Sequence, residues 1–295
     1  MLGSMVADYL SRDDSCKVAA TVRTKEMAAK CLKNADNIDW LLFDAGAPDI
    51  DKSLKVIDGY EWIINAIGIT KPLVHDNNAF EVERAIKINS LFPYHLVRMA
   101  EANKARVLQI ATDCVYSGRK GKYTEKDEYD PPDIYGKTKS LGEAALPNNF
   151  LLRCSIIGPE PKEHKFLLDW FLGQPQKAQV SGYTNHNWNG VTTLQFARLC
   201  QGIIKKGIKP PQVQHIIPAA DITKCDMLKE FARCYHREDI TITPVQAPVV
   251  IDRTLRTVDE VSNLAIWEAA GYAKPPSVPE MITEMAGFDS RLTGI

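Results

Sequence analysis

Short apolar runs alternate with amphipathic stretches over the first half of the chain. The apolar runs have the length of β-strands and lie at residues 17–22, 40–43, 62–67, 106–110 and 150–152. Stretches with helical periodicity separate or flank them, at residues 3–10, 25–32, 80–102 and 135–145. Strands that alternate with helices of this length are typical of βαβ units. We therefore expect an α/β fold with a doubly wound parallel sheet and right-handed crossovers.

The pattern changes after Gly158 and Pro159. Proline-rich or polar connectors join helical stretches at residues 166–172, 193–206, 225–234, 258–270 and 278–286. Two short strands are expected at residues 214–217 and 240–243. We expect residues 1–158 to form the sheet domain. Residues 159–295 then form a smaller mixed α/β lobe over the C-terminal edge of the sheet, with some crossing of the chain between the lobes.

The beginning of the chain departs from a complete Rossmann-like fold. Such a fold opens with a strand, a turn of the form G-x-x-G-x-x-G and a helix. Gly3 fits the third glycine of that turn, and the strand and the two earlier glycines are not in the sequence. A missing central strand leaves backbone groups unpaired in the core. We expect a fragment or a start at an internal methionine; a protein that truly lacks the strand and binds cofactor poorly is the alternative.

Composition narrows the class of protein. The net charge of -1 gives no electrostatic reason to expect nucleic acid or an anionic membrane as a partner. The sequence has no apolar run long enough for a transmembrane helix and no signal-peptide pattern at its first residues. The seven cysteines include no C-x-x-C pair, which argues against a disulfide framework or a zinc site. We expect a cytoplasmic protein.

Three side chains predict a site for carbonyl reduction. Thr112 ends an expected strand, where ligand sites of open parallel sheets lie. Tyr135 and Lys139 are four residues apart, on one face of an expected helix. A lysine ammonium beside a phenol lowers the tyrosine pKa, and such a tyrosine can protonate a carbonyl oxygen while hydride reaches the carbon. The threonine hydroxyl can hold that oxygen.

The spacing of Tyr135 and Lys139 is not unique, because Tyr116 and Lys120 repeat it. That second pair contains Ser117-Gly118, which disfavours a helix. Tyr135 instead follows Pro131, Pro132 and Asp133, a pattern typical of a helix start. The plain alternative for Tyr135 is a surface tyrosine with a solvated lysine one turn further on.

The surrounding segment, residues 110–143, reads IATDCVYSGRKGKYTEKDEYDPPDIYGKTKSLGE. It resembles the dTDP-4-dehydrorhamnose reductase family of the extended short-chain dehydrogenases/reductases. That family carries runs similar to S-T-D-Y-V-F-D-G, Y-x-E and P-x-x-x-Y-G-x-T-K-x-x-G-E. The resemblance implies that Thr112, Tyr135 and Lys139 are the catalytic residues. It also implies an oxidoreductase of carbohydrate biosynthesis that reduces a 4-keto nucleotide sugar with NADPH.

Cofactor contacts are expected at the ends of the early strands. Arg23 stands where an arginine accommodates the extra phosphate of NADP, which favours NADP(H) and leaves NAD(H) as the alternative. The resemblance implies further contacts, and an Asn89 that supports the site through backbone hydrogen bonds. The expected cofactor residues are Gly3, Arg23, Asp44, Ala45, Asn65, Ala66, Gly68, Asn89, Tyr135 and Lys139. For Asp44 a helix cap is nearly as good an interpretation.

Substrate contacts are expected in the second half. The run from Arg153 through Ser155 to Pro159 resembles the L-R-x-S-x-x-G run that leads into the substrate lobe of the family. Residues 183–191, YTNHNWNGV, offer Trp188 for stacking on a sugar or base and Asn185, His186 and Asn189 for hydroxyl groups. A well-bonded surface loop is the alternative for this stretch. Arg253 could pair with a diphosphate.

The second lobe matches the family more loosely than the first. Acidic residues that would bind a bridging metal are not evident, so no metal is expected, and another 4-keto sugar nucleotide stays open as substrate. An epimerase or dehydratase with retained NAD is an alternative, although Asp113 and Cys114 are not the Asp-Glu pair of dehydratases. A non-catalytic regulatory subunit on the same fold is another. A homodimer is left open.

Overall fold

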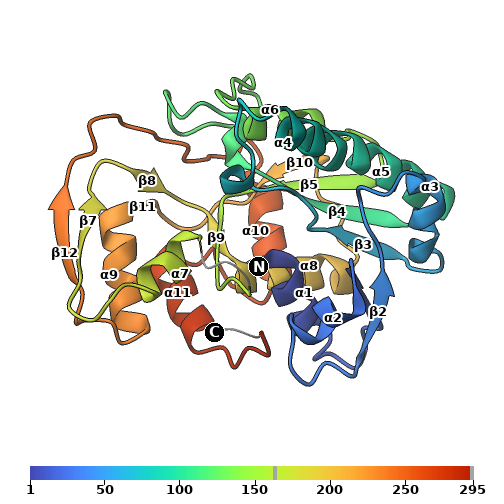
Figure 1. The fold of residues 1–295 in the computed structure, drawn as a ribbon, viewed down its shortest axis with the longest axis horizontal. Helices are drawn as coiled ribbons and strands as arrows, with labels where there is room; N and C mark the ends of the chain where they lie inside the picture. Colours follow the sequence, from blue (N-terminus) through green and yellow to red (C-terminus); the bar gives the residue numbers. More distant parts are fainter. Residues whose placement is uncertain (162–164, 293–295) are drawn as a thin grey trace.

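The computed structural model describes residues 1–161 and 165–292. Its centre is a parallel sheet in two parts (Figure 1). The smaller part pairs β1 (Val18–Val22) with β2 (Ile38–Leu42). The larger part has the order β10-β5-β4-β3, formed by Val213–His215, Asn149–Arg153, Arg106–Ala111 and Trp62–Asn65. The predicted α/β class with a parallel sheet is confirmed. The strand expected at 214–217 belongs to this sheet and not to the smaller lobe.

The sheet is interrupted between β1 and β3. Within the described residues, β1 pairs only with β2 and β3 pairs only with β4. Every residue of β5 is buried, whereas only Asn65 is buried in β3 and only Val22 in β1. In the strand order 3-2-1-4 of dinucleotide-binding sheets, the first strand lies between the second and the fourth. The interruption therefore falls where the strand that the sequence lacks is expected.

Helices cover both faces of the larger sheet (Figure 1). One face carries α4 (Ala79–Ala85), α5 (Phe92–Ala102) and α6 (Ile134–Leu141), and the other α1 (Leu2–Leu10), α8 (Thr193–Lys206) and α10 (Glu260–Ala269). Neighbouring residues of a strand point to opposite faces. On β4, Val107 accordingly packs in one hydrophobic cluster with Phe92 of α5, and Leu108 in another with Leu199 of α8. The short helices α2 (Lys25–Ala29) and α3 (Ile50–Ser53) follow β1 and β2.

The smaller lobe is built from short strands and three helices. The helices are α7 (Leu167–Leu172), α9 (Lys224–Cys234) and α11 (Val278–Ala286). Two strand pairs are parallel: β7 (Gln179–Tyr183) with β12 (Thr241–Val245), and β6 (Ile156–Ile157) with β9 (Val191–Thr192). The pair of β8 (Asn187–Trp188) and β11 (Ile222–Thr223) is antiparallel. The lobe lies at the left in Figure 1, beside the ends of β4 and β5.

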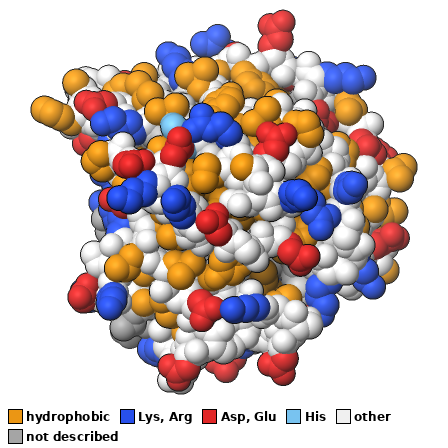
Figure 2. All heavy atoms as spheres, turned by 90° about the vertical axis from the view of Figure 1, so that its right-hand side faces the viewer, with side chains coloured by type: hydrophobic (Ala, Val, Ile, Leu, Met, Phe, Trp, Pro, Cys, Tyr) orange, Lys and Arg blue, Asp and Glu red, His pale blue; other side chains and the backbone are white. Residues whose placement is uncertain are grey.

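The surface carries charges of both signs. Acidic and basic side chains are interspersed over the face that carries α3 (Figure 2). All seven cysteines are free thiols. Among the described residues, no helix combines the length and the apolar character that a membrane crossing requires.

Helix α1 is tied to the C-terminal part of the chain through Asp8, whose side chain is fully buried. Its Oδ1 accepts hydrogen bonds from Nε of Arg12 at 2.9 Å and Nε of Arg291 at 2.7 Å, and its Oδ2 accepts one from the backbone N–H of Arg291 at 2.9 Å. Burial alone raises the pKa of this carboxyl, but these hydrogen bonds outweigh it and hold the pKa below its usual value.

We expect Asp8→Asn to lower the free energy of unfolding by about 2 kcal/mol, because it removes one member of a buried ion pair whose guanidinium partners are partly exposed. A carboxyl with a lowered folded pKa stabilises the fold above its unfolded pKa, and this contribution is lost as the pH falls. The difference from the natural protein should therefore shrink below about pH 4. Urea unfolding at pH 7 and at about pH 3 measures it. Asp14→Asn, at an exposed residue, is the control, and an equal loss in both variants contradicts the role of Asp8.

Candidate active site

Thr112 follows β4 directly and begins the turn Asp113–Val115, where its Oγ1 accepts the backbone N–H of Cys114 at 3.2 Å. Tyr135 lies in the first turn of α6, which Asp133 caps by accepting the N–H of Gly136 at 2.8 Å. The side chains of Tyr135 and Thr112 lie close to each other, and the Thr112 hydroxyl acts to lower the pKa of the phenol. Tyr135 as a whole residue is partly exposed. Two of the three predicted catalytic residues therefore meet at the end of an inner strand.

Gly136 allows this meeting. A Cβ at this position would lie 2.3 Å from the carbonyl oxygen of Cys114 and 2.6 Å from Cβ of Pro131. Only a residue without a side chain lets the backbone of α6 approach the turn after β4 so closely. Gly142 has the same effect at the other end of α6, where a Cβ would lie 1.8 Å from the carbonyl oxygen of Asn89. The two glycines fix the position of α6, and thereby of Tyr135, against the sheet.

Lys139 lies one turn after Tyr135 and points towards the ends of β3 and β4. Its Nζ donates to the carbonyl oxygen of Ile110 at 3.4 Å and lies 3.9 Å from where a Cβ on Gly68 would stand. Burial raises the pKa of Tyr135 above its ordinary value and lowers that of Lys139. The net shift of the tyrosine pKa is upward, because burial outweighs the lowering effects that act on the phenol.

Asn89 connects α6 to the turn after β3. It lies in a π-helical segment, Ile86–Leu91, between α4 and α5. Its Oδ1 accepts the N–H of Ile69 at 2.8 Å, and its Nδ2 donates to the carbonyl oxygen of Ile69 at 3.0 Å and to Oγ1 of Thr138 at 3.2 Å. Single π-helical turns occur frequently at functional sites. Asn89 thus makes the backbone hydrogen bonds expected of it, and it acts by positioning its neighbours.

The turn after β3 gathers several expected cofactor residues. Oδ1 of buried Asn65 accepts the N–H of Ile67 at 3.2 Å and shapes the turn. A Cβ on Gly3 would lie 3.6 Å from Cβ of Ala66, so the start of α1 lies beside the same turn. A Cβ on Gly68 would lie 3.4 Å from Oδ1 of Asn89. Space beside Lys139 is therefore kept open by glycine.

The remaining expected cofactor residues follow β1 and β2. Arg23 is exposed, and within the described residues its side chain has no hydrogen-bond or ion-pair partner. Asp44 is exposed as well, and its Oδ1 accepts the N–H of Gly46 at 2.8 Å. Asp44 therefore closes a turn, whereas α3 is capped by Asp49. Ala45 is partly buried next to Asp44.

Two expected substrate residues are committed to other contacts. Arg153 is fully buried and donates to Glu143, to Oη of Tyr116 at 3.1 Å and to Nε2 of His215 at 2.8 Å. Asn189 binds the backbone of Leu255 with both ends of its amide, at 2.8 and 2.9 Å. The predicted substrate contacts of Arg153 and Asn189 do not fit these positions, because neither side chain has a free group facing solvent.

The rest of the stretch 183–191 is also well bonded. Asn185 bonds both backbone groups of Ala247, and Nε2 of His186 contacts the carbonyl oxygen of Val249 at 2.9 Å. The indole N–H of Trp188, 6% exposed, donates to Oγ of Ser155 at 2.8 Å. A well-bonded segment, the alternative interpretation, therefore describes this stretch, and Ser155 and Trp188 hold each other at its inner end.

Arg253 reaches the site from residues 246–258, here called the strap. The strap is hydrogen-bonded to the loop 116–123. The backbone N–H of Asp252 donates to the carbonyl oxygen of Gly118 at 2.8 Å, and the backbone N–H of Tyr123 donates to the carbonyl oxygen of Thr254 at 2.9 Å. Nε of Arg253 donates to the carbonyl oxygen of Tyr116 at 2.8 Å. Burial raises the pKa of Asp113, beside Thr112, and the charge of Arg253 opposes this shift.

Lys224, at the start of α9, also acts on Asp113 and was not predicted from the sequence. Its ammonium lies 5.3 Å from the ring centroid of Trp188. A sequence signal existed, because a lysine in the first turn of a helix opposes the helix dipole.

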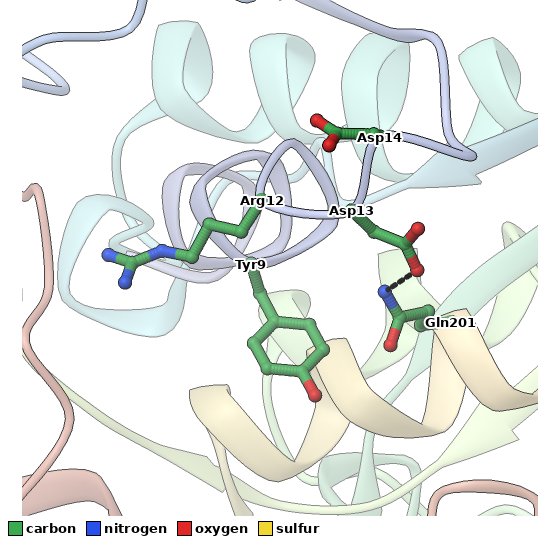
Figure 3. Close-up of a pocket in the computed structure, with 5 residues that line it drawn as sticks. All are labelled: Tyr9, Arg12, Asp13, Asp14 and Gln201. Atoms are coloured by element: carbon green, nitrogen blue, oxygen red, sulfur yellow. Dashed lines mark hydrogen bonds between the residues drawn. The ribbon is translucent and has the colours of Figure 1, made fainter.

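A separate surface pocket of about 440 Å³ lies at the end of α1 (Figure 3). It is lined by Tyr9, Arg12, Asp13, Asp14 and Gln201. Nε2 of Gln201 donates to Asp13 at 3.1 Å, while Arg12 points away from both. The pocket shares no residue with the Thr112 site. In the part of the chain that the structure describes, no group of three or more His, Cys, Asp or Glu side chains is arranged to hold a metal ion.

A parallel α/β sheet with Thr112, Tyr135 and Lys139 at the end of an inner strand, beside a second lobe, defines the class as extended short-chain dehydrogenase/reductase. A comparison with known families agrees. The family described as RmlD substrate binding domain matches residues 59–286. The chain belongs to this family.

Individual relatives match shorter segments. The chain is 33% identical over 137 residues to a dTDP-4-dehydrorhamnose reductase of Aggregatibacter actinomycetemcomitans, a match that covers 43% of this chain and 46% of the relative. It is 26% identical over 167 residues to Methionine adenosyltransferase 2 subunit beta of Rattus norvegicus, covering 53% and 50%. The chain thus spans about half the length of these curated relatives.

Solved structures show the same fold over nearly the whole chain. A dTDP-4-dehydrorhamnose reductase from Bacillus anthracis str. Ames, in complex with NADP, has a TM-score of 0.66 at 17% identity. The likeness covers 91% of this chain and 97% of that protein. At this identity it shows the fold alone.

We expect Gly136→Ala to lower stability by about 1–3 kcal/mol, because the added methyl overlaps the carbonyl oxygen of Cys114 and forces α6 away from the turn. Thermal unfolding measures the loss. Lys137→Ala, at an exposed position of the same helix, should leave stability within about 0.5 kcal/mol. Equal stability of the two variants would show that α6 has room to shift.

Proposed function

We propose that this protein reduces the keto carbon of a nucleotide-linked sugar with NADPH, and that the substrate is a 4-keto sugar of the dTDP-4-dehydrorhamnose type. The observation that carries the proposal is the proximity of Tyr135 and Thr112 at the end of β4, with Lys139 one helical turn away. Membership of the family and the similarity to a dTDP-4-dehydrorhamnose reductase support it.

The residues around the turn after β3 fit a dinucleotide. Gly3 and Gly68 leave space beside Ala66 and Lys139 that larger side chains would fill. Arg23 offers an unpaired cation for the additional phosphate of NADP, and Asp44 and Ala45 follow the neighbouring strand. When bound, NADPH supplies the hydride that the carbonyl carbon accepts. The glycines, Asn65 and Arg23 bind and orient that cofactor.

Thr112 and Tyr135 act on the carbonyl oxygen. The Thr112 hydroxyl holds that oxygen by a hydrogen bond, and Tyr135 Oη delivers the proton that turns it into a hydroxyl group. Burial keeps the pKa of Tyr135 high, so the phenol is protonated and ready to donate at neutral pH. Lys139 provides positive charge beside the helix face and stabilises the phenolate that remains after proton transfer. The net change is an alcohol from a ketone, with one hydride and one proton added.

Tyr135→Phe should reduce turnover at least 100-fold, because it removes the proton donor and leaves the ring that packs against the turn. NADPH oxidation, followed by absorbance with a panel of 4-keto nucleotide sugars, measures this loss. Tyr94→Phe, at an exposed tyrosine of α5, is the control and should keep full activity. Turnover near the natural level in the Tyr135 variant argues against the assigned role, provided that its thermal unfolding is unchanged.

Arg23→Glu should weaken NADPH binding about tenfold or more and affect NADH much less, because the carboxylate repels the phosphate that distinguishes the two. Fluorescence titration with each cofactor gives the ratio. Lys25→Glu places the same charge change two residues away on an exposed side chain. A similar loss in both variants assigns the effect to general charge and not to Arg23.

A second candidate is a non-catalytic subunit on the same fold. The sequence similarity to Methionine adenosyltransferase 2 subunit beta covers 53% of the chain, against 43% for the dTDP-4-dehydrorhamnose reductase of Aggregatibacter actinomycetemcomitans. This candidate predicts stable association with a methionine adenosyltransferase catalytic subunit, measurable by co-purification and analytical ultracentrifugation. It also predicts no NADPH oxidation with any keto sugar. Turnover that depends on Tyr135 excludes it as the sole function.

A further inference from the structure

Three buried amide side chains lie on neighbouring strands of the larger sheet. They are Asn65 at the end of β3, Gln109 in β4 and Asn149 at the start of β5, here called the amide row, and each is at most 4% exposed. Nδ2 of Asn65 donates to Oε1 of Gln109 at 3.4 Å, and Nδ2 of Asn149 donates to the same oxygen at 3.5 Å. Gln109 is therefore the member of the row that contacts both of the others.

The amide row joins the end of α6 to the sheet. Nε2 of Gln109 donates to the carbonyl oxygen of Gly142, the C-cap residue of α6, at 2.8 Å. Nδ2 of Asn149 donates to the carbonyl oxygen of Ala144, two residues further along the chain, at 2.8 Å. Side chains of β4 and β5 thereby fix the C-terminal end of the helix that carries Tyr135.

The other end of the row shapes the turn after β3. Oδ1 of Asn65 accepts the backbone N–H of Ile67 at 3.2 Å, while Nδ2 of Asn65 donates to Gln109. Gln109 itself lies three residues before Thr112, which follows β4 directly. The amide group of this one residue thus connects three segments: the strand that leads to Thr112, the end of α6, and the turn expected to hold the cofactor.

Stability alone does not require an amide at this position. Val107 and Gln109 lie on the same face of β4, and Val107 packs with Phe92 in a hydrophobic cluster. A buried amide loses its hydrogen bonds to water, and replacing paired polar groups with apolar groups of the same shape can be nearly neutral for stability. Apolar packing is non-directional, however. The amide of Gln109 has a donor end and an acceptor end, and each is committed to a different segment.

We propose that Gln109 is a positioning residue that fixes α6 and the turn after β3 relative to each other and to Thr112. Without its amide, α6 and the turn can shift independently, so that the distance from the phenol of Tyr135 to a cofactor on the turn is no longer constant. The kinetic part of this inference rests on the proposed function, because it takes the turn to hold NADPH and Tyr135 to deliver the proton. Proximity and orientation supply much of the rate enhancement of enzymes, so a small displacement lowers turnover strongly.

Hydrogen–deuterium exchange of the full chain, followed by mass spectrometry, tests the connection without a ligand. Gln109→Met keeps the length of the side chain and removes both ends of the amide. It should raise the exchange rates of residues 66–70 and 138–144 together, by about threefold or more. Asn148→Ala is the matched control, because Nδ2 of Asn148 donates to the carbonyl oxygens of Val97 and Ala105, both at 3.2 Å, and so connects the start of β5 with α5. That variant should change exchange around residues 97–105 only.

NADPH oxidation, measured at a temperature at which every variant is folded, tests the effect on turnover. Gln109→Met should lower kcat by about 10-fold or more and leave KM for the sugar within about twofold, because the bound groups are misaligned and not lost. Asn148→Ala should keep the natural kcat.

Gln109→Glu separates positioning from the filling of space. A neutral glutamic acid can donate to Gly142 and accept from Asn65, whereas the ionised form has no donor. Burial raises the pKa of such a carboxyl, so the neutral form gains population as the pH falls. The turnover of this variant, relative to the natural protein at the same pH, should therefore rise towards low pH, while that of Gln109→Met stays low throughout.

Three results overturn the inference. Unchanged exchange of residues 66–70 or 138–144 in Gln109→Met shows that the amide row does not hold them. A natural kcat in that variant, or an equal loss of kcat in Asn148→Ala, shows that Gln109 only stabilises the fold. If the natural protein oxidises NADPH with no keto sugar, the proposed function fails, and the exchange measurement still decides whether Gln109 holds the two segments together.

Discussion

The close approach of α6 to the turn after β4 is the contact on which the site depends. Thr112 belongs to the sheet and Tyr135 to a helix, and their side chains meet because Gly136 has no Cβ to hold the two backbones apart. The opposite side of α6 is held by the π-helical segment, in which Asn89 binds Ile69 and Thr138. Because α6 is in contact on both sides, Tyr135 is held in one position, and proton transfer requires this preorganisation.

A buried polar cluster supports this arrangement from behind. Arg153 at the end of β5 joins Glu143 after α6 and His215 at the end of β10. Burial and the charge of Arg153 lower the pKa of His215 to about 4, so the imidazole ring is neutral. Its Nε2 accepts a hydrogen bond from Arg153, and its Nδ1 donates one to the carbonyl oxygen of Arg256 in the strap at 2.7 Å. Through this cluster the ends of two strands and the strap hold a common geometry. The buried charge of Arg153 is tolerated here because Glu143 pairs with it and Tyr116, Tyr129 and His215 accept its hydrogen bonds.

The sequence was informative where structure is local. Alternating apolar and amphipathic stretches located the main strands and helices, and Thr112, Tyr135 and Lys139 followed from strand ends and helical spacing. Contacts between distant segments were not accessible in this way. Arg153 resembles a substrate residue by its motif, but only the fold reveals Glu143 and His215 around it. Asn189 offers the same polar groups to a sugar as to Leu255. For Lys224 no expectation came from the sequence, because lysine is usually a surface residue, whereas the fold places it where its charge acts on Asp113.

The interruption of the sheet has a mechanical consequence. Arg23 and Asp44 stand on the β1–β2 piece, whereas Tyr135 and Lys139 are anchored to the piece that contains β4. Apolar packing, in which Val18 of β1 and Ile64 of β3 share one cluster with α1, joins the two pieces, and the described residues form no hydrogen-bonded ladder between them. Side-chain packing resists sliding less than a ladder does. A dinucleotide long enough to contact both pieces would fix their relative position, and the free energy needed to align them would reduce its binding free energy.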